Sequence, residues 1–168
     1  MARQRAALFE QLYAEYAGMV HQLCLGFVRG RTQEADDLSQ EVFVQVWRHL
    51  GEFRQEASAK TWLYRITVNA CLQYTRKLER RRERELTTPD EVADGPTDHA
   101  TDTVGSQLER LYAAIGTLPE IDRLIYMLTL EGQTNAQIAD VTGLTPGALR
   151  VRIHRSRQTL RKKLTHAN

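Results

Sequence analysis

Positive charge is concentrated at the C-terminal end of the sequence. Residues 145–168 contain seven Lys or Arg residues and no Asp or Glu. Both side chains pair with nucleic-acid phosphates, and the arginine guanidinium also donates hydrogen bonds to base edges. A charge run on its own is usually a solvated surface, so the choice between the two interpretations depends on the element that carries the cations.

The residues around these cations predict a helix-turn-helix. A short periodic stretch, NAQIADVT at 135–142, is followed by Gly143 and then by Thr145 and Pro146. Threonine is a preferred N-cap residue, and proline is favoured at the first position of a helix. We therefore expect a short helix, a glycine turn and a basic helix over 146–164, an arrangement that places its second helix in the DNA major groove.

The predicted basic helix has two different faces. One stripe, with spacings of three and four residues, is expected to pack on the preceding helices: Leu149, Ile153, Ser156, Leu160 and Leu164. On the opposite arc, Arg and Gln near the helix start are placed to reach base edges, and the later cations to meet phosphates. The capped start, the turn glycine and the lack of acidic residues favour DNA contact over a solvated surface. The predicted DNA-facing residues are Thr145, Ala148, Arg150, Val151, Arg152, His154, Arg155 and Gln158.

Charge is also segregated in the middle of the sequence, although the net charge is only +2. Residues 76–85 contain six basic and three acidic residues, whereas residues 86–106 contain five acidic and no basic residues. The acidic stretch is rich in proline, glycine and threonine and has no helical or strand period, so it is predicted to be a linker. We expect two small domains, residues 1–85 and 107–168, joined by this linker.

The fold is predicted to be all-α. Apolar residues recur every three or four positions in both halves, and no segment shows the sustained alternation of a half-buried strand. Thr117 with Glu120 and Thr134 with Gln137 match the capping-box pattern of helix starts. The expected helices lie near residues 5–28, 33–50, 59–84, 107–116, 119–131, 135–142 and 146–164.

The second predicted helix has an apolar face and an acidic face. The apolar face, expected in the core, consists of Ala35, Leu38, Val42, Val46 and Leu50. The other face contains Asp37, Gln40, Glu41, Val44 and Arg48. Such a face is typical of a solvent-exposed surface, and it would also suit docking onto a basic partner helix. Both interpretations remain open from the residues alone.

The sequence has no pattern that indicates catalysis or metal binding. Cys24 and Cys71 each lie in an apolar periodic segment without a CxxC pair, so we expect buried core thiols. There is no glycine-rich phosphate loop, and the five histidines share no motif. We therefore expect neither an enzyme nor a cofactor. The absence of a long apolar run and of a signal-peptide pattern predicts a cytoplasmic protein without membrane insertion.

Two blocks of the sequence resemble the extracytoplasmic-function sigma factors of bacterial RNA polymerase. The first is DDLSQEVFVQVWRHL followed by FRQEASAKTWLYRITVNACLQYTRK, and the second is LPEIDRLIYMLTLEGQTNAQIADVTGLTPGALRVRIHRSRQTLRKKL. The resemblance covers about residues 8–84 and 107–165. The second block alone also resembles many helix-turn-helix regulators, whereas both blocks in this order are specific to the family.

The resemblance implies roles for the N-terminal half. In the family, the acidic helix binds the clamp helices of the largest polymerase subunit, which assigns docking to Asp37, Gln40, Glu41 and Val44. The loop from Phe53 to Lys60 would capture a base flipped out of the minus-10 promoter element, and the helix after it would hold the separated strand. The minus-10 residues implied in this way are Phe53, Arg54, Ser58, Lys60, Trp62, Arg65, Asn69, Arg76 and Lys77.

The resemblance also implies roles for the C-terminal half and for partners. The last helix would read the minus-35 element through Arg150, Val151, His154 and Arg155. Val151 and His154 depart from the hydroxyl and aromatic residues that are common at these positions, so the preferred DNA sequence is not predicted. The implied partners are promoter DNA, core RNA polymerase through its clamp helices and flap, and an anti-sigma factor, with the chain itself monomeric.

The linker suits two promoter elements on one duplex. About 20 extended residues reach at most ~70 Å, which is about the separation of two sites two helical turns apart. Its five carboxylates would either mimic nucleic acid in the polymerase cleft or act only as a solubilising spacer; they are Asp90, Glu91, Asp94, Asp98 and Asp102.

Two other functions fit parts of the sequence. A stand-alone helix-turn-helix regulator would explain the C-terminal half but would leave the acidic face of the second helix and the TWLYR block without a purpose. An adaptor that only binds other proteins would not need the basic C-terminal helix.

Overall fold

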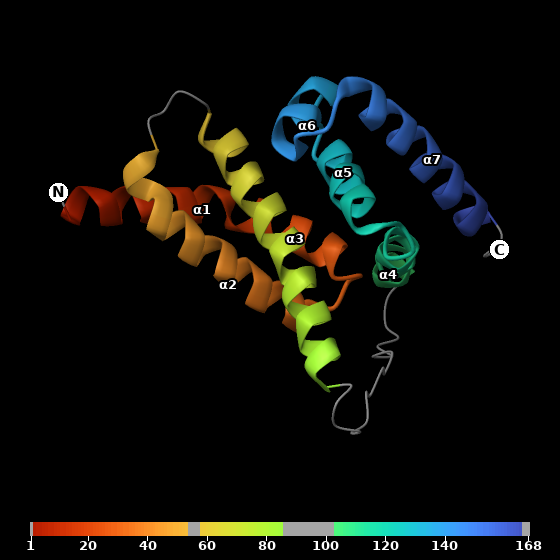
Figure 1. Ribbon diagram of the computed structural model, residues 1–168, viewed down its shortest axis with the longest axis horizontal. Coiled ribbons are helices and arrows are strands. Elements are labelled where there is room, and N and C mark those ends of the chain that lie inside the picture. Colours follow the sequence, from red (N-terminus) through yellow and green to blue (C-terminus); the bar gives the residue numbers. More distant parts are fainter. Residues whose placement is uncertain (1, 54–57, 86–102, 166–168) are drawn as a thin grey trace.

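The computed structural model describes residues 2–53, 58–85 and 103–165, and the regular structure in these ranges is entirely helical. The predicted all-α fold is confirmed, with helix bounds within a few residues of those expected. None of the described helices is both long and apolar enough to cross a membrane. The helices are α1 (Ala2–Phe27), α2 (Thr32–His49), the 3-10 helix η1 (Leu50–Glu52), α3 (Ala59–Glu85), α4 (Thr103–Ile115), α5 (Glu120–Leu130), α6 (Asn135–Thr142) and α7 (Pro146–Thr165), drawn in Figure 1.

Helices α1, α2 and α3 pack together as the N-terminal domain. Every residue of the predicted apolar face of α2 is buried, from Ala35 to Leu50. That face packs with buried side chains that include Leu23 of α1 and Leu63 of α3. Burial of one such side chain contributes about 1.5–3 kcal/mol, so the apolar stripes determine how the three helices are oriented. The acidic face of α2 and the cationic side of α3 are consequently left outside.

The helix-turn-helix is formed by α6 and α7. Thr134 and Gln137 form the predicted capping box: the Gln137 N–H donates to the Thr134 hydroxyl at 3.2 Å, and the Thr134 N–H donates to the Gln137 side chain at 2.8 Å. Gly143 has a φ of 73°, a left-handed conformation that glycine adopts without steric cost. The Thr145 hydroxyl accepts the Ala148 N–H at 3.3 Å, as predicted for the start of α7. Short-range contacts therefore define both helices.

The predicted capping box at Thr117 and Glu120 does not form. The Thr117 hydroxyl instead donates to the Ala114 carbonyl at 2.7 Å, and Pro119 precedes α5 without a side-chain cap. Thr117 thus bonds to the last turn of α4 and does not cap the start of α5, which begins three positions later at Glu120.

Leu164 was expected on the packed stripe of α7 but is 43% exposed. The other four members, Leu149, Ile153, Ser156 and Leu160, are buried. The packed face of α7 ends at Leu160, so the last turn extends past the helices beneath it. In addition, α4 starts at Thr103, so the final residues of the predicted linker 86–106 are helical, and the rest of that linker lies outside the described residues.

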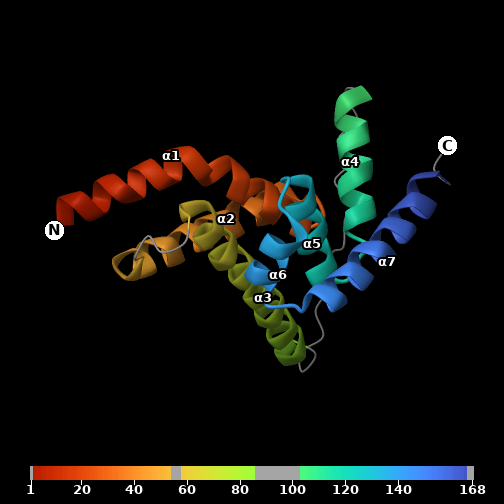
Figure 2. The ribbon, with the colours of Figure 1, turned by 90° about the horizontal axis from the view of Figure 1, so that it is seen from above.

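The two domains are in contact. Helix α1 packs against α4 and α5, and α3 packs against α5 and α6. Figure 2 shows α5 and α6 beside α3 and the C-terminal end of α1. One cluster of buried apolar residues runs through both domains. The chain is therefore closed upon itself, an arrangement that the sequence left open.

Candidate nucleic-acid interface

Helix α7 presents most of its predicted DNA-facing residues to solvent. The pattern of buried residues at Leu149, Ile153 and Leu160 turns the opposite arc outward. The exposed arc includes the aliphatic Val151, which is 49% exposed. The exposed members of the predicted set are Thr145, Ala148, Arg150, Val151, His154, Arg155 and Gln158.

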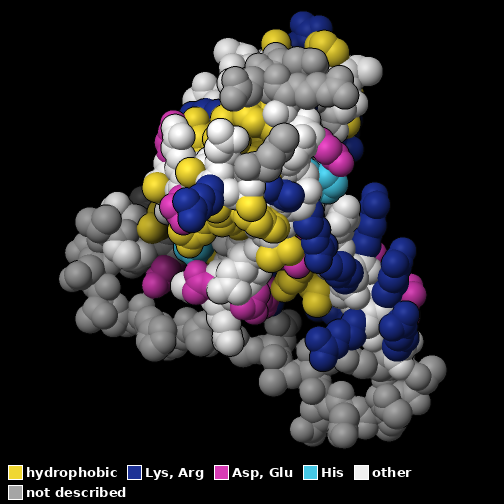
Figure 3. Space-filling model, turned by 90° about the vertical axis from the view of Figure 1, so that its left-hand side faces the viewer, with side chains coloured by type: hydrophobic (Ala, Val, Ile, Leu, Met, Phe, Trp, Pro, Cys, Tyr) yellow, Lys and Arg dark blue, Asp and Glu magenta, His cyan; other side chains and the backbone are white. Residues whose placement is uncertain are grey.

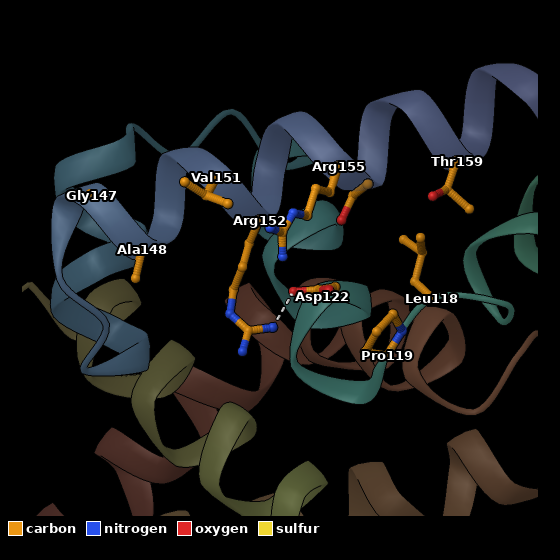
Figure 4. Close-up of a pocket in the computed structure, with 10 residues that line it drawn as sticks. Leu118, Pro119, Asp122, Gly147, Ala148, Val151, Arg152, Arg155 and Thr159 are labelled. Carbon is orange, nitrogen blue, oxygen red and sulfur yellow. Dashed lines mark hydrogen bonds and ion pairs between the residues drawn. The ribbon is translucent and has the colours of Figure 1, made fainter.

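Arg152 differs from the other predicted DNA-facing residues. Its Nη1 donates to Asp122 Oδ1 of α5 at 2.8 Å, and Asp122 is only 7% exposed. Figure 4 shows Arg152 reaching from α7 to Asp122 across a cleft of about 540 Å³. Arg152 therefore links α7 to α5 through this hydrogen bond. No local sequence pattern indicates this pair, because its members lie thirty positions apart.

The cationic side of α3 contains the residues that the resemblance assigned to a separated strand. Asn69, Arg76 and Lys77 are exposed, and Arg65 is half-buried. Arg65 Nη2 lies 2.6 Å from Asp140 Oδ2 of α6, so in this structure its partner is a carboxylate of the C-terminal domain. Figure 3 shows Lys and Arg side chains gathered along one edge of the molecule, next to a band of exposed hydrophobic side chains.

Two aromatic residues, Phe53 and Trp62, flank positions 54–57 in the sequence, and their rings are in contact. The Phe53 and Trp62 ring centroids are 4.7 Å apart with an interplanar angle of 34°. Lys60 Nζ lies 5.8 Å from the centre of the Tyr64 ring, and the Ser58 hydroxyl caps α3 by accepting the Thr61 N–H at 3.1 Å. Aromatic rings are groups on which an unpaired base can stack. Arg54, also predicted to bind the minus-10 element, lies outside the described residues.

The acidic face of α2 lies next to an apolar groove that the sequence analysis missed. Asp37 and Gln40 are exposed, Val44 is 43% exposed, and the half-buried Glu41 accepts a hydrogen bond from Gln45 at 3.4 Å. Gln40 and Val44 line a groove of about 600 Å³ between α1 and α2. Its other walls are Ala6, Phe9, Glu10, Tyr13, Phe43 and Trp47.

The groove is lined by interlocked aromatic rings. The Tyr13 and Phe43 ring centroids are 4.7 Å apart, and the Phe9 and Trp47 ring centroids are 5.4 Å apart. Tyr13 is 52% exposed and Trp47 40% exposed. Each helix contributes aromatics four residues apart, a spacing visible in the sequence, but only the packing of α1 on α2 brings the two pairs together. An exposed apolar groove with a polar rim suits a protein partner.

Several tyrosine and cysteine side chains have pKa values that are shifted by their surroundings. Burial raises the pKa of Tyr64 to about 12, and burial together with its hydrogen bond to Glu34 raises the pKa of Tyr74 to about 12. Cys24 and Cys71 are free and buried, as predicted. A hydrogen bond from Cys71 lowers the pKa of Cys24, while burial raises the pKa of Cys71. No group of His, Cys, Asp and Glu among the described residues could hold a metal ion.

Comparisons with known families match both domains. A family model described as Sigma-70 region 2 matches residues 12–82, and one described as Sigma-70, region 4 matches residues 108–160. The chain is 31% identical to the RNA polymerase sigma-H factor of Pseudomonas aeruginosa, covering 93% of this chain and 86% of that protein. It is 30% identical to the ECF RNA polymerase sigma-E factor of Haemophilus influenzae, covering 93% of this chain and 87% of that protein.

Two solved structures have the same architecture. CnrH, in complex with the cytosolic domain of CnrY, matches with a TM-score of 0.70 at 26% identity, covering 99% of this chain and 96% of that one. The sigma factor RpoE of Bartonella quintana, in complex with the anti-sigma factor NepR, matches with a TM-score of 0.75 at 21% identity, covering 94% and 96%. The second likeness concerns the fold alone.

Proposed function

The chain belongs to the extracytoplasmic-function group of the sigma-70 RNA polymerase sigma factors, and we propose that it contacts promoter DNA through α7 and α3 while the groove beside α2 holds core polymerase. Sigma factors bind core polymerase for transcription initiation and are not enzymes. The proposal assigns those tasks to residues. The observation that carries it is α7, a capped helix whose outward arc is rich in cations.

We assign minus-35 recognition to the exposed arc of α7. Arg150 and Arg155 are placed for base edges and phosphates, and Val151 offers an apolar contact to a thymine methyl group. Arg152 acts by holding the helix in position, since it pairs with the buried Asp122 carboxylate of α5. The boundaries proposed for the module are residues 107–168, extended at the front by the first turn of α4.

We assign minus-10 capture to the start and the cationic side of α3, within a module of residues 1–85. The Phe53 and Trp62 rings supply a stacking surface for an extruded base. Arg65, Asn69, Arg76 and Lys77 then follow one another along the helix toward its C-terminal end. A row of donors on one helix tracks a flexible phosphate backbone without needing to read its sequence.

We assign core polymerase binding to Asp37, Gln40, Glu41 and Val44 together with the aromatic groove. Acidic and polar groups at the rim would orient a basic helix of the polymerase clamp, and the groove would receive its apolar side chains. The exposed Val44 and Trp47 have an explanation on this view, because both become buried in the complex.

Regulation by an anti-sigma factor is part of the proposal. The two similar solved proteins were each captured with an inhibitor or a partner's cytosolic domain, which supports a comparable partner for this chain. A protein that acts on polymerase and chromosomal DNA works in the cytoplasm. The flap of the polymerase is a second proposed contact, and the chain is proposed to act as a monomer.

Reconstituted transcription tests the function. Purified core polymerase is combined with the chain and with genomic fragments of the source bacterium, and the 5′ ends of the transcripts are sequenced. We expect starts at a small set of promoters that core polymerase alone does not use. A chain that binds these fragments but never starts transcription would be a stand-alone regulator, and the proposal would be wrong.

A double variant tests the docking face. Asp37→Ala with Gln40→Ala should weaken core binding by about fivefold or more, since truncated interface residues at hot spots cost over ~1 kcal/mol. The affinity of the full chain for minus-35 duplex DNA should stay the same. Glu52→Ala, an exposed acid just after α2, is the matched control. Equal loss of both activities would contradict a separate docking face.

A further inference from the structure

The start of α1 is fastened to the end of α2 by one side chain. Arg5 Nη2 donates to the Trp47 carbonyl and to the Arg48 carbonyl, the latter at 3.5 Å. Both acceptors lie in the last turn of α2, where carbonyls lack intrahelical partners and carry partial negative charge. Figure 1 shows the N-terminal end of α1 beside that end of α2. Arg5 therefore caps a helix to which it does not belong.

The same guanidinium covers the ring of Trp47. The Arg5 Cζ atom lies 4.8 Å from the centre of the indole, within the range of a cation–π contact. The Phe9 ring meets the same indole nearly edge-on, with an interplanar angle of 87°. Arg5 thus holds both the backbone and the ring of Trp47, while Phe9 supports the ring from α1.

Trp47 benefits from this support because it is partly exposed. Its side chain forms part of the wall of the groove between α1 and α2, near the end of its helix, and is 40% exposed. An exposed side chain without contacts exchanges between rotamers, and ordering a large side chain on binding costs affinity. Fixing the Trp47 ring before the partner arrives therefore raises the affinity of the groove for that partner.

The contacts of Arg5 are not arranged for its own hydrogen bonding. Arg5 Nε is buried and has no hydrogen-bond partner among the described residues. A buried donor without a partner costs free energy of folding, and such donors are rare in proteins. The position of the guanidinium therefore follows from the two carbonyls and the indole that it meets.

We infer that Arg5 is a positioning residue for core polymerase binding, which holds the Trp47 indole in the wall of the groove in the orientation that the partner meets. The inference deepens the proposed function and rests on the assignment of the groove to polymerase. Arg5 acts through Trp47, so the first turn of α1 belongs to the docking surface without contacting the partner through its guanidinium.

Fluorescence of the free chain tests the positioning. The chain has two tryptophans, so Trp62→Phe leaves Trp47 as the single emitter. In this background Arg5→Ala should increase quenching of Trp47 by acrylamide, because one face of the indole is uncovered, with helix content by circular dichroism unchanged. Arg3→Ala, which removes the same charge from an exposed position in the same turn, is the matched control. Equal quenching in the two alanine variants would overturn the inference.

Binding to purified core polymerase measures the consequence. Arg5→Ala should weaken the affinity about two- to tenfold, the range that corresponds to ordering one large side chain. Arg5→Lys should recover part of this loss, because an ammonium still lies over the indole but does not bridge two carbonyls as a guanidinium does. Arg3→Ala should bind as the unchanged chain does. If Arg5→Ala binds as tightly as Arg3→Ala, the inference is wrong.

A double-mutant cycle separates this inference from the proposed function. Trp47→Ala should weaken core binding, and Arg5→Ala should cause no further loss in the Trp47→Ala background. A further loss of the same size would mean that Arg5 contacts polymerase directly, so the positioning role would be wrong while the groove stays the docking site. If Trp47→Ala has no effect, the assignment of the groove to polymerase is wrong, and the inference that rests on it is wrong as well.

Discussion

Helices α7 and α3 carry the two cationic surfaces of this sigma factor, and they are prepared for DNA to different degrees. The start of α7 is capped by Thr145, it follows a glycine turn, and its outward arc is exposed. The cationic side of α3 has Arg65 paired with a carboxylate of the other domain. If α7 reads the duplex and α3 holds the separated strand, as proposed, Arg65 must exchange the Asp140 carboxylate for a phosphate, whereas the exposed arc of α7 needs no such exchange.

The difference corresponds to the chemistry of the two targets. A duplex major groove is a fixed shape, so a rigid helix with set side chains is the suitable reader. An unpaired strand has no fixed shape, so exposed polar side chains along one helix, such as Asn69, Arg76 and Lys77, suit its flexible backbone.

The largest expected effect is on the α7 side of the comparison. Arg155→Ala should weaken minus-35 duplex binding by ~1–3 kcal/mol and relax specificity at one base pair. Fluorescence anisotropy with promoter duplexes and single-base variants measures both quantities. Single-strand binding should not change. A loss of affinity that is the same for every duplex would mean that Arg155 contacts phosphate only.

The corresponding change on the α3 side is Trp62→Ala. Loss of the ring beside Phe53 should weaken binding of a minus-10 single strand by about 1–2 kcal/mol, because base stacking on an aromatic side chain contributes that much. Trp62→Phe should restore most of the affinity, whereas duplex binding should be the same in all three proteins. Failure of the phenylalanine to rescue would point to a packing role for the indole.

A smaller effect concerns the start of α7. Thr145→Ala removes the hydroxyl that accepts the Ala148 N–H, and loss of such a cap costs about 1 kcal/mol of unfolding free energy. Urea denaturation measures this cost, with Thr145→Ser as the control that keeps the hydroxyl. Minus-35 affinity should fall with the Ala variant only. A weaker affinity without a change in stability would make Thr145 a direct DNA contact.

Features set by neighbouring residues were predicted from the sequence. The α6 capping box, the Gly143 turn and the start of α7 each depend on residues no more than four positions apart, and all three formed. The capping box at Thr117 did not form, because the Thr117 hydroxyl bonds to the end of α4 instead. The same four-residue pattern is therefore compatible with a threonine that ends one helix and with a threonine that starts the next. Short patterns identify a helix boundary better than they identify which helix uses it.

Features set by packing could not be predicted. Arg65 and Asp140 are 75 positions apart, and no local pattern predicts that they pair. The aromatic groove has the same origin, since the spacing of Phe9 and Tyr13 is compatible with an ordinary core stripe. Most of the predicted α7 arc is exposed because burial of the opposite stripe requires it, and Arg152 is the exception because a buried carboxylate lies within its reach.

The smallest expected effect separates two roles of Arg152 by its sign. Asp122→Asn keeps the shape and an acceptor but removes the charge that faces Arg152. The Arg152 side chain is 39% exposed, so the pair contributes only about 0.5–1 kcal/mol. If Arg152 holds α7 on α5, minus-35 affinity should fall slightly. If Arg152 instead reaches DNA, the released guanidinium should raise that affinity and steepen its dependence on salt by about one phosphate contact. Duplex binding at two salt concentrations measures both, and a rise would return Arg152 to the set of direct contacts.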